Sequence, residues 1–550
     1  MTLREKLEHT ADFLLGVELV STRGTVTETR AARTVGFAEE LAAHERVDWV
    51  SFTDNAGGNP QLAPAALARL VRAAGRDVVV HLSCKDFNRN ALESEVWHLA
   101  SEGLHNLLVL SGDYPGAGLA GGGKPVFDID SVGLLTLLAH LNAGLDVTRP
   151  GAKKTARLAA TEFFPSCVVT NFKLHENEVV PQLLKLEKKL QCGARWIINQ
   201  IGYDSRKSHE LIAWLRERGW GHVPLIGNVY LLNPGVARLF RDQRIPGVVI
   251  SDELAALCAA KAAEPDRGRA WFIELAARQL AIFRGLGYRG AYIGGIHARA
   301  DLDAILALAD SYGADAWRAF AREIRFNRPG EFFLYAEDEA TGLADASRPS
   351  AAALASRARP SSRNITFTYR FSKVMHAALF APGRGLWNLG RKITSAARDP
   401  LQGPKLLRVT EHASKVALFG CQDCGDCSLA DIAFLCPESA CAKNQRNGPC
   451  GGTRDGKCEV GDFECIWARA YDRLNHEGRA DQLLAHSPVI QNQALRGTSS
   501  WANVWQGRDH LAHPLSVPVA AVPVPVTGRG DGPPLSTSCP PPTALNSPSP

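Results

Sequence analysis

Eight of the 13 cysteines fall between Cys421 and Cys465, and no histidine lies among them. In a chain without secretory features, such a group indicates a metal site rather than a set of disulfides. Thiolates are the ligands of iron–sulfur clusters and of structural zinc. The candidate ligands are Cys421, Cys424, Cys427, Cys436, Cys441, Cys450, Cys458 and Cys465.

The spacing of these cysteines leaves the choice of metal open. The first four read C-x2-C-x2-C-x8-C-P, which has the order of the bacterial ferredoxin motif with a longer last gap. Eight thiolates suffice for two 4Fe–4S clusters, but two C-x2-C steps also suit a zinc site with four cysteine ligands. We predict at least one iron–sulfur cluster, with zinc alone or free thiols as the alternatives.

A second group of polar residues lies in the first 315 residues, where short apolar runs end. Glu18 interrupts an apolar run, and burying a carboxylate there is costly unless the group is paired or functional. An ion pair with a neighbouring Lys or Arg is the structural alternative. Asp113 stands after a glycine, where an Asx turn or a helix N-cap is the alternative. The other polar residues at these ends include Thr53, Asp54, His81, Ser111, Gly112, His175 and Gln200.

Apolar runs alternate with helical stretches such as 26–43, 63–74 and 90–101, a pattern typical of βα units around a parallel sheet. Eight units in about 300 residues predict a (β/α)8 barrel, in which the polar residues at the strand ends share one rim. A doubly wound open sheet is the second choice, since no G-x-G-x-x-G follows the first strand. The predicted strands are Phe13–Val20, Trp49–Thr53, Val78–Leu82, Asn106–Leu110, Ser166–Thr170, Trp196–Gln200, Val223–Gly227 and Ala291–Gly294.

The composition changes after the barrel, which we place at residues 1–315. Residues 316–363 are predicted to be an exposed linker, because 337–363 are rich in Ala, Ser, Arg and Pro. Residues 364–486 form the cysteine-rich domain. Residues 487–550 are predicted to be a disordered tail, because they are rich in proline and poor in charge.

Net charge gives no case for a nucleic-acid or membrane partner, since 62 basic residues face 57 acidic ones. No apolar run reaches the roughly 18 residues of a membrane span. The N-terminus is charged and lacks a signal core, so we expect a cytoplasmic protein. Two basic stretches could bind an anion. GGGKP at 121–125 is predicted to be an exposed flexible loop. Lys185, Lys188 and Lys189 lie on one helix and are either a solvated face or a diphosphate site.

Residues from about 10 to 315 resemble methylenetetrahydrofolate reductase, a family of flavin-dependent barrels of one-carbon metabolism. The resemblance lies in GVELVS, VSFTDNAGG, VHLSCKD, EGLHNLLVLSGDYP, GGGKPVFD and LEKKLQCGARWIINQIGYDS, which occur in the family's order. It implies reduction of 5,10-methylenetetrahydrofolate to 5-methyltetrahydrofolate. Glu18 matches the family's general acid, Asp113 the aspartate between flavin and pterin, and Gln200 the pterin ligand, with Arg299 as a further folate contact. The implied FAD or FMN contacts are Thr53, Asp54, His81, Ser111, Gly112, Asp113, His175, Lys185 and Lys189.

Two features leave the electron donor open. After the seventh strand the chain reads GNVYLLNPG, where many relatives have PGILP in the loop that receives nicotinamide. NQRNGPCGGTRDGKCEV at 444–460 resembles the C-terminal domain of some family members, for which clusters are implicated. The donor is therefore NAD(P)H or a ferredoxin-like protein, and a homo-oligomer is compatible with either. A metal-dependent methyltransferase barrel and a non-catalytic electron-transfer protein are the alternative functions.

Overall fold

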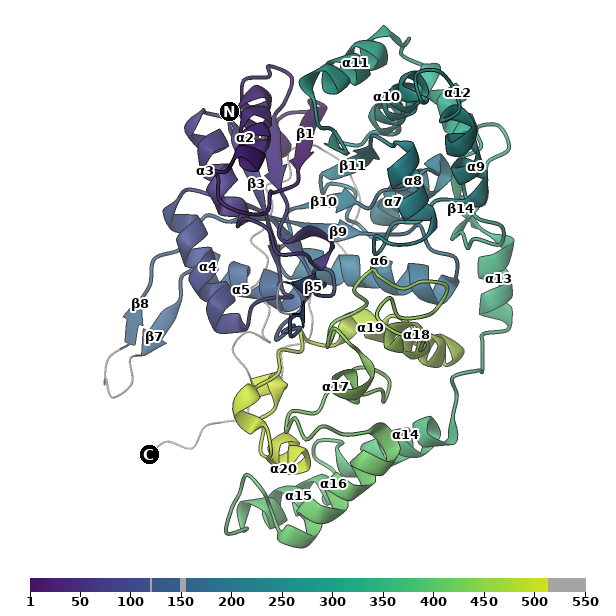
Figure 1. Ribbon diagram of the computed structural model, residues 1–550. Coiled ribbons are helices and arrows are strands. Elements are labelled where there is room, and N and C mark those ends of the chain that lie inside the picture. The colour runs from purple at the N-terminus through teal and green to yellow at the C-terminus, as the bar shows by residue number, and fades with distance from the viewer. Residues whose placement is uncertain (119–120, 149–154, 513–550) are drawn as a thin grey trace. The chain divides into compact units, whose positions relative to one another are not determined.

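The computed structural model describes residues 1–118, 121–148 and 155–512 (Figure 1). Its centre is a closed barrel of eight parallel strands in the order β1-β12-β11-β10-β9-β4-β3-β2. Every predicted strand is present, so the predicted (β/α)8 fold is confirmed. The strands are β1 (Leu14–Leu19), β2 (Trp49–Phe52), β3 (Asp77–Ser83), β4 (Asn106–Leu110), β9 (Phe164–Val169), β10 (Trp196–Asn199), β11 (Leu225–Tyr230) and β12 (Gly290–Gly294).

Large side chains fill the barrel interior and leave the carboxyl ends of the strands for chemistry. Trp49 and Trp196 meet edge to face at 5.9 Å, and both are fully buried. Helix α1 (Leu3–His9) adds Leu3 and Leu7 to the same apolar cluster, and the backbone N–H of Leu3 donates to Asp77 at the start of β3. A barrel filled in this way is a packed core rather than a pore, so its site lies at the carboxyl rim, called here the barrel mouth.

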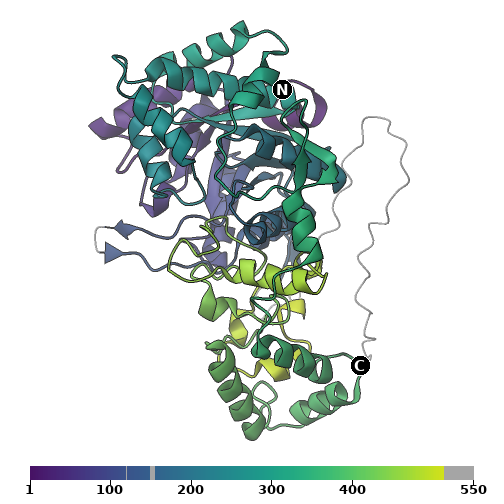
Figure 2. The same ribbon diagram turned by 90° about the vertical axis from the view of Figure 1, so that its right-hand side faces the viewer.

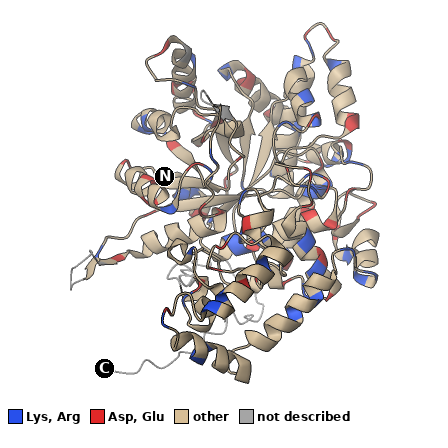
Figure 3. Cartoon of the chain, turned by 60° about the horizontal axis from the view of Figure 1, so that its bottom comes forward, with Lys and Arg blue, Asp and Glu red and all other residues tan. Residues whose placement is uncertain are grey.

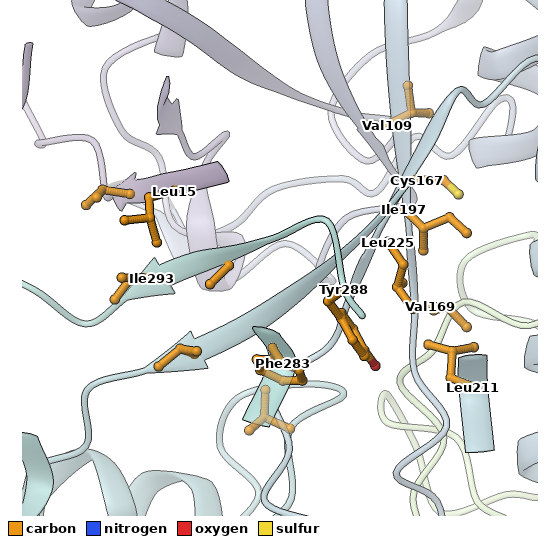
Figure 4. Packing of buried hydrophobic residues seen from close by; sticks show 14 of the residues in the cluster. Leu15, Val109, Cys167, Val169, Ile197, Leu211, Leu225, Phe283, Tyr288 and Ile293 are labelled. Carbon is orange, nitrogen blue, oxygen red and sulfur yellow. The ribbon is translucent and has the colours of Figure 1, made fainter. Parts of the chain in front are cut away.

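Helices surround the strands and bury a second, larger apolar layer between helix and sheet (Figure 4). That layer includes Cys167 of β9, Ile197 of β10 and Leu211, and Phe283 packs beside Tyr288 with ring centroids 4.6 Å apart. The helices are α2 (Thr29–Ala42), α3 (Pro64–Ala73), α4 (Arg89–Ser101), α5 (Ser131–Ala143), α6 (Glu176–Gln191), α7 (Ser205–Glu217), α8 (Pro234–Arg241), α9 (Asp252–Lys261), α10 (Arg269–Leu286) and α11 (Arg299–Ser311).

Residues 316–363, predicted as a linker, contain regular structure. They hold α12 (Ala316–Glu323), a hairpin of β13 (Tyr335–Glu337) and β14 (Ala344–Pro349), and α13 (Ala351–Ala358). The hairpin is tied to α7, because Glu210 accepts hydrogen bonds from the backbone of Leu334 and Tyr335. Composition alone missed this structure, since the buried aromatic residues that anchor it precede the Ala- and Ser-rich stretch.

The C-terminal part packs against α6 through α18 and α19 (Figure 2). Folded structure continues through residue 512, so the prediction of disorder is wrong for 487–512, where Ile490, Asn503 and Trp505 are buried. Ile490 and Trp505 supply buried apolar area that a prediction from proline content does not take into account. Residues 513–550 lie outside the described part of the chain. The helices are α14 (Phe367–Leu379), α15 (Gly385–Ser395), α16 (Lys405–Phe419), α17 (Pro437–Ala440), α18 (Ile466–His476), α19 (Gln482–Ala485) and α20 (Ser500–Trp505).

Candidate active site

Glu18 lies near the carboxyl end of β1 with its side chain partly accessible from the barrel mouth. Its Oε2 accepts a hydrogen bond of 2.8 Å from the hydroxyl of Tyr292 on β12. Burial raises the pKa of Glu18, against the smaller opposing effect of that hydrogen bond. No Lys or Arg in the described residues forms an ion pair with Glu18, so the structural alternative of a paired carboxylate is not what the fold contains. Such a carboxyl holds its proton to higher pH than an ordinary glutamate does.

A short polar chain continues from Glu18 into the barrel. The Tyr292 hydroxyl lies 3.3 Å from Nε2 of His81, and the same nitrogen lies 3.2 Å from Oγ of Ser51. Burial lowers the pKa of His81 to about 3, so this imidazole is neutral. Tyr230 lies at the end of β11, and burial followed by the charge of Glu18 raises its pKa to about 12. Glu18 is thus the acidic group of a network whose other members stay uncharged.

Asp54 and Thr53, predicted as flavin contacts, hold the loop after β2. Asp54 Oδ2 accepts a 3.0 Å hydrogen bond from the backbone N–H of Ser83 and a second from its hydroxyl. Lys85 donates to the carbonyl oxygens of Asp54 and Asn55. The Thr53 hydroxyl oxygen accepts from the backbone N–H of Ser21 at 3.3 Å. The Asp54 carboxylate therefore serves the protein's own loop in this structure.

The Ser111–Gly112–Asp113 turn follows β4 and depends on its glycine. Gly112 has φ of +86°, and a Cβ there would lie 3.0 Å from side-chain atoms of Lys85 and Ser83. Asp113 Oδ2 accepts a 2.9 Å hydrogen bond from the backbone N–H of Gly57. This contact fixes the carboxylate at the mouth, beside the loop after β2.

The C-terminal part reaches into this turn with residues 443–453, which we call the docking segment. Ser111 Oγ donates to Oε1 of Gln445 at 2.9 Å, and Lys443 Nζ donates to the carbonyl of Gly112 at 2.8 Å. Lys443 also pairs with Glu459, and both side chains are almost fully buried. The turn that matches the family's flavin-binding turn is therefore also a contact between the barrel and the cysteine-rich domain.

Buried lysines of the barrel hold the rest of the docking segment by its carbonyl oxygens. Lys185 donates to Gln445 Oε1 and to the carbonyl of Gly448, both at 3.0 Å. Lys173 donates to the carbonyls of Gly451 and Thr453, both at 2.6 Å. Gly448 has φ of +127°, and a Cβ there would lie 2.7 Å from the Lys185 side chain. The segment between these anchors carries Cys450, so the barrel itself fixes one of the predicted metal ligands.

Asp130 is the buried anion of this contact. Its carboxylate caps α5 through the N–H groups of Val132 and Gly133, and it accepts from the N–H of Arg446 and from the N–H and side-chain amide of Asn447. Burial alone would raise the pKa of Asp130, but Lys185 and these hydrogen bonds outweigh it and lower the pKa. The ionised form is therefore the one that the fold stabilises.

Replacing Asp130 with Asn is expected to lower the free energy of unfolding by about 3 kcal/mol at pH 7, since hydrogen bonds to a buried charge are lost. The stabilisation from a lowered pKa is complete above the ordinary value of 3.8 and disappears as pH falls through the folded value. Urea unfolding of both proteins at several pH values should show the deficit shrinking below about pH 4. Asp146→Asn, which removes an exposed ion pair with Arg157, is the control and should cost under about 1 kcal/mol. Equal deficits at pH 7 and pH 3 would contradict this role.

Of the remaining predicted site residues, three lie beside the strand ends or the docking segment and one, Arg299, lies on a partly exposed helix. Lys189 is buried and donates to the Val168 carbonyl at 2.6 Å; burial lowers its pKa to about 8, and no carboxylate pairs with it in the described residues. His175 is the N-cap residue of α6, near Gly456. Gln200 turns its amide nitrogen toward Gly247 beside the docking segment. Arg299, in contrast, is half exposed and pairs with Asp303 on α11.

Several buried polar atoms in and near the docking segment have no partner among the described residues, and three of them are of interest for ligand binding at the rim. These three are Thr170 Oγ1 and Asn199 Nδ2, at the ends of β9 and β10, and Gln182 Nε2 on α6. Thr170 and Gln182 both approach Gly451. Buried polar atoms are nearly always satisfied in folded proteins. Together with the Lys189 ammonium, which has a carbonyl but no carboxylate as its partner in the described residues, they are the features that a polar, anionic ligand at this rim would satisfy. The GGGKP loop, by contrast, is exposed at 121–124, and its first two residues form β6 (Gly121–Gly122), which pairs with β5 (Ala117–Gly118).

The eight cysteines line two separate pockets in sequence order. The outer cysteine site comprises Cys421, Cys424, Cys427 and Cys436, with Lys415 and Arg446 in its wall. The inner cysteine site comprises Cys441, Cys450, Cys458 and Cys465, with Lys443 and Gln445 of the docking segment. Burial raises the pKa of Cys424 and of Cys441 to about 12. In the described part of the chain, no three Cys, His, Asp or Glu side chains converge closely enough to hold a single metal ion.

The family is decided by matches to two family models. Residues 3–297 match the methylenetetrahydrofolate reductase model, and residues 404–493 match the model described as methylene-tetrahydrofolate reductase C terminal. The chain belongs to the methylenetetrahydrofolate reductase family. The predicted family and its fused C-terminal domain are thereby confirmed, and a folate-related reductase is the function class that this membership supports.

Other comparisons add little to this membership. No curated protein matches the chain. An uncharacterized Clostridium thermocellum protein that binds two copies of 5-methyl-5,6,7,8-tetrahydrofolic acid is 12% identical, with 56% of this chain and 97% of that chain covered and a TM-score of 0.38. Dihydropteroate synthase from Thermus thermophilus is 15% identical, with 55% of this chain and 95% of that chain covered and a TM-score of 0.29. Within the described residues, no helix is long and apolar enough to cross a membrane.

Several residues of this reductase-family site were missed from the sequence. Tyr292 lies in a predicted strand, where its hydroxyl is hidden within an apolar run, and no motif marks Asp130, Lys443 or Gln445. Gln445 lies in the segment that resembles the family's C-terminal domain, and Lys443 lies directly before it. Both are polar residues between Cys441 and Cys450, and this is the only sequence feature that could have indicated them.

Proposed function

We propose that this reductase-family chain reduces 5,10-methylenetetrahydrofolate to 5-methyltetrahydrofolate with a bound flavin. The observation that carries the proposal is Glu18, a carboxyl at the barrel mouth with a raised pKa and no cationic partner in the described residues. Reduction requires that the bridging five-membered ring of the folate open first, and opening needs a proton at the departing nitrogen. A carboxyl whose pKa is raised keeps its proton to higher pH than an ordinary glutamate, which suits it to donate that proton.

The neighbouring residues have supporting roles in this proposal. Tyr292 orients the Glu18 carboxyl through its hydroxyl, and neutral His81 holds Tyr292 without adding charge. Asp113 places a negative charge at the mouth, where it stabilises the cation that ring opening produces. Gln200 offers an amide for the pterin. Arg299 is not needed for these steps, since its guanidinium pairs with Asp303.

The residues present fit a phosphate-bearing flavin. The Lys189 ammonium is buried with only a carbonyl as its partner, and the unsatisfied atoms of Thr170, Gln182 and Asn199 lie along the same rim. Lys189 would hold the anionic part, and the Ser111–Asp113 turn would face the ring system. When bound, the flavin supplies the hydride that reduces the open folate. Lys185 and Ser111, which contact Gln445, would act by keeping the docking segment in place.

We further propose that the two cysteine sites hold one 4Fe–4S cluster each. A zinc ion draws its sulfur ligands to about 2.3 Å from a single centre, whereas a cubane spreads four thiolates over its corners. Four cysteines line each pocket, which is the number of thiolates that one cubane requires. Lys415 and Lys443 in the two walls would offset the negative charge of the thiolates.

The proposed function is tested with protein purified without oxygen. Its visible spectrum should show flavin bands together with broad cluster absorbance, and metal analysis should find iron and sulfide. The protein should convert methylenetetrahydrofolate when supplied with a strong artificial reductant. A colourless, zinc-containing protein that transfers a methyl group to a thiol would replace this proposal with the methyltransferase barrel.

Removing the charge of Asp113 is expected to raise the flavin reduction potential, because an anion beside the ring disfavours its anionic reduced form. Asn keeps an oxygen that can accept from the Gly57 N–H, so Asp113→Asn isolates the charge. We expect a rise of about 30 mV, equal to about 1.4 kcal/mol for a two-electron couple. Potentiometric titration measures it, with Asp310→Asn on α11 as the remote control. An unchanged or lower potential would place Asp113 away from the flavin.

A further inference from the structure

Helices α14, α15 and α16 turn apolar stripes toward solvent. Over half of the exposed large apolar side chains of the described residues lie in 367–418. Isolated exposed apolar groups are ordinary, but stripes on neighbouring helices mark an interaction surface. The stripes are Phe367, Phe371, Val374 and Met375 on α14, Leu386, Leu389 and Ile393 on α15, and Leu406, Val409 and Val416 on α16.

The same helices carry a concentration of positive charge. Six basic residues between 370 and 405 are exposed and form no ion pair with another described residue: Arg370, Arg384, Arg391, Lys392, Arg398 and Lys405. Acidic residues are nearly absent from 364–419: Glu411 is buried against Lys415 and Ser500, which leaves Asp399 as the exposed one. Basic residues are drawn in blue in Figure 3. Because the chain as a whole is nearly balanced, this excess gives the three helices a distinct positive field.

Helix α16 separates this exposed surface from the outer cysteine site. One side of α16 lines that site with Arg408, His412 and Lys415, and the other side exposes Leu406 and Val409. A helix with its side chains is about 10–12 Å across. A molecule bound on the exposed side therefore lies about one helix diameter from the outer cysteines.

The two cysteine sites continue the path to the barrel. Cys436 of the outer site and Cys441 of the inner site are the two cap residues of α17, which is a single turn of about 6 Å. Cys450 of the inner site lies in the docking segment, which Lys173 and Lys185 hold against the barrel. The ligand sites thus form a series from the exposed face of α16 to the barrel mouth.

We propose that the exposed face of α14–α16 binds a small acidic one-electron carrier protein, which delivers electrons to the outer cysteine site. The proposal rests on the proposed function, since it assigns the partner of the same reaction. Charge selects an acidic protein, and the apolar stripes supply the desolvated centre of the contact. The adjacency of the outer site favours a redox protein over other acidic partners.

The electrons balance with two carrier molecules for each folate. Each reduced carrier loses one electron and is oxidised. The methylene group gains both electrons and one proton as a hydride, and the departing ring nitrogen takes a second proton from Glu18. The carbon–nitrogen bond of the bridge breaks and a carbon–hydrogen bond of the new methyl group forms.

Binding of a purified acidic bacterial ferredoxin to the full-length, anaerobically purified protein tests this surface. Calorimetry at low and high salt should give a Kd that weakens steeply with salt, because exposed charges are screened. The Lys392→Glu/Lys405→Glu protein and Leu406→Gln should each weaken binding at least tenfold. The matched controls are Arg322→Glu on α12 and Leu70→Gln on α3, both exposed and outside the three helices, and they should stay within twofold.

Activity with a small viologen reductant separates this proposal from the proposed function. The surface variants should keep wild-type viologen-driven folate reduction, since their changes leave both cysteine sites and the mouth intact. Absence of viologen-driven activity in the wild type would defeat the proposed function. The ferredoxin Kd would still test whether the face of α14–α16 binds the carrier. Three results would overturn the surface: no ferredoxin binding, equal binding by wild type and variants, or stripes that instead mediate self-association or binding to anionic phosphatidylglycerol vesicles.

Discussion

Glu18→Gln is expected to lower folate reduction by at least about 10³-fold while the protein still binds flavin and accepts electrons. General acid catalysis by one positioned group contributes about 10²–10⁴-fold, and opening of the folate ring has no second acid in this network. Gln preserves the size of the side chain and can still accept from the Tyr292 hydroxyl, so the packing of the mouth is retained. Single-turnover kinetics would measure the folate step, and the flavin spectrum would confirm cofactor binding. Near-normal folate turnover in this variant would remove Glu18 from the mechanism.

Tyr292→Phe gives an independent check through the pH dependence. Glu18 must be protonated to act, so the rate falls as pH rises through its raised pKa. The Tyr292 hydrogen bond favours the ionised carboxylate and lowers the pKa against the larger effect of burial. Its removal should therefore move the alkaline limb of the rate profile to higher pH, with a loss in maximal rate smaller than that of Glu18→Gln. A limb that moves to lower pH, or that does not move, would show that Tyr292 does not tune Glu18.

The barrel strands could be predicted because buried parallel strands are nearly continuous apolar runs. β4 was predicted with its bounds correct, whereas β11 begins and ends two to three residues later than predicted, at Leu225 and Tyr230. Asn228 and Tyr230 are polar, so the pattern ended the strand before them, although the barrel buries Asn228. The hairpin within 316–363 could not be predicted from composition. Its backbone is also held by Glu210, more than 120 residues away, and composition does not encode such a long-range contact.

The candidate site could be predicted as a set of positions but not as a set of contacts. Strand-end logic places Glu18 and Asp113 on one rim, because parallel strands end together. It does not provide Tyr292, which is 274 residues from Glu18, or Gln445, which is 334 residues from Ser111. The lysines of α6 show the same limit. Their spacing equally suits a solvated face and a phosphate site, yet Lys185 is buried because the docking segment covers it.

Separate substitutions in the two cysteine sites should each remove half of the iron and stop electron flow from the carrier protein to the folate. Two 4Fe–4S clusters contain about eight iron atoms, so Cys421→Ser/Cys424→Ser and Cys450→Ser/Cys458→Ser should each retain about four. The expectation follows from the linings, in which the outer and inner sites share no cysteine. Cys84→Ser, which changes a buried cysteine outside both sites, is the control and should keep all the iron.

The order of the sites predicts how the two double variants differ. Loss of the outer site should lower carrier-driven activity by about 10²-fold or more. The inner iron should stay reducible by a small viologen. Loss of the inner site should leave the outer iron reducible by the carrier but isolate it from the folate, because the remaining route to the barrel mouth passes through the docking segment that carries Cys450. Iron and sulfide analysis, the reduced-minus-oxidised spectrum and anaerobic assays with ferredoxin, viologen and NADH distinguish these states. If the protein contains no iron and both variants keep full activity with NADH, electrons enter at the barrel directly and the cysteine-rich domain serves the fold, as a structural zinc domain would.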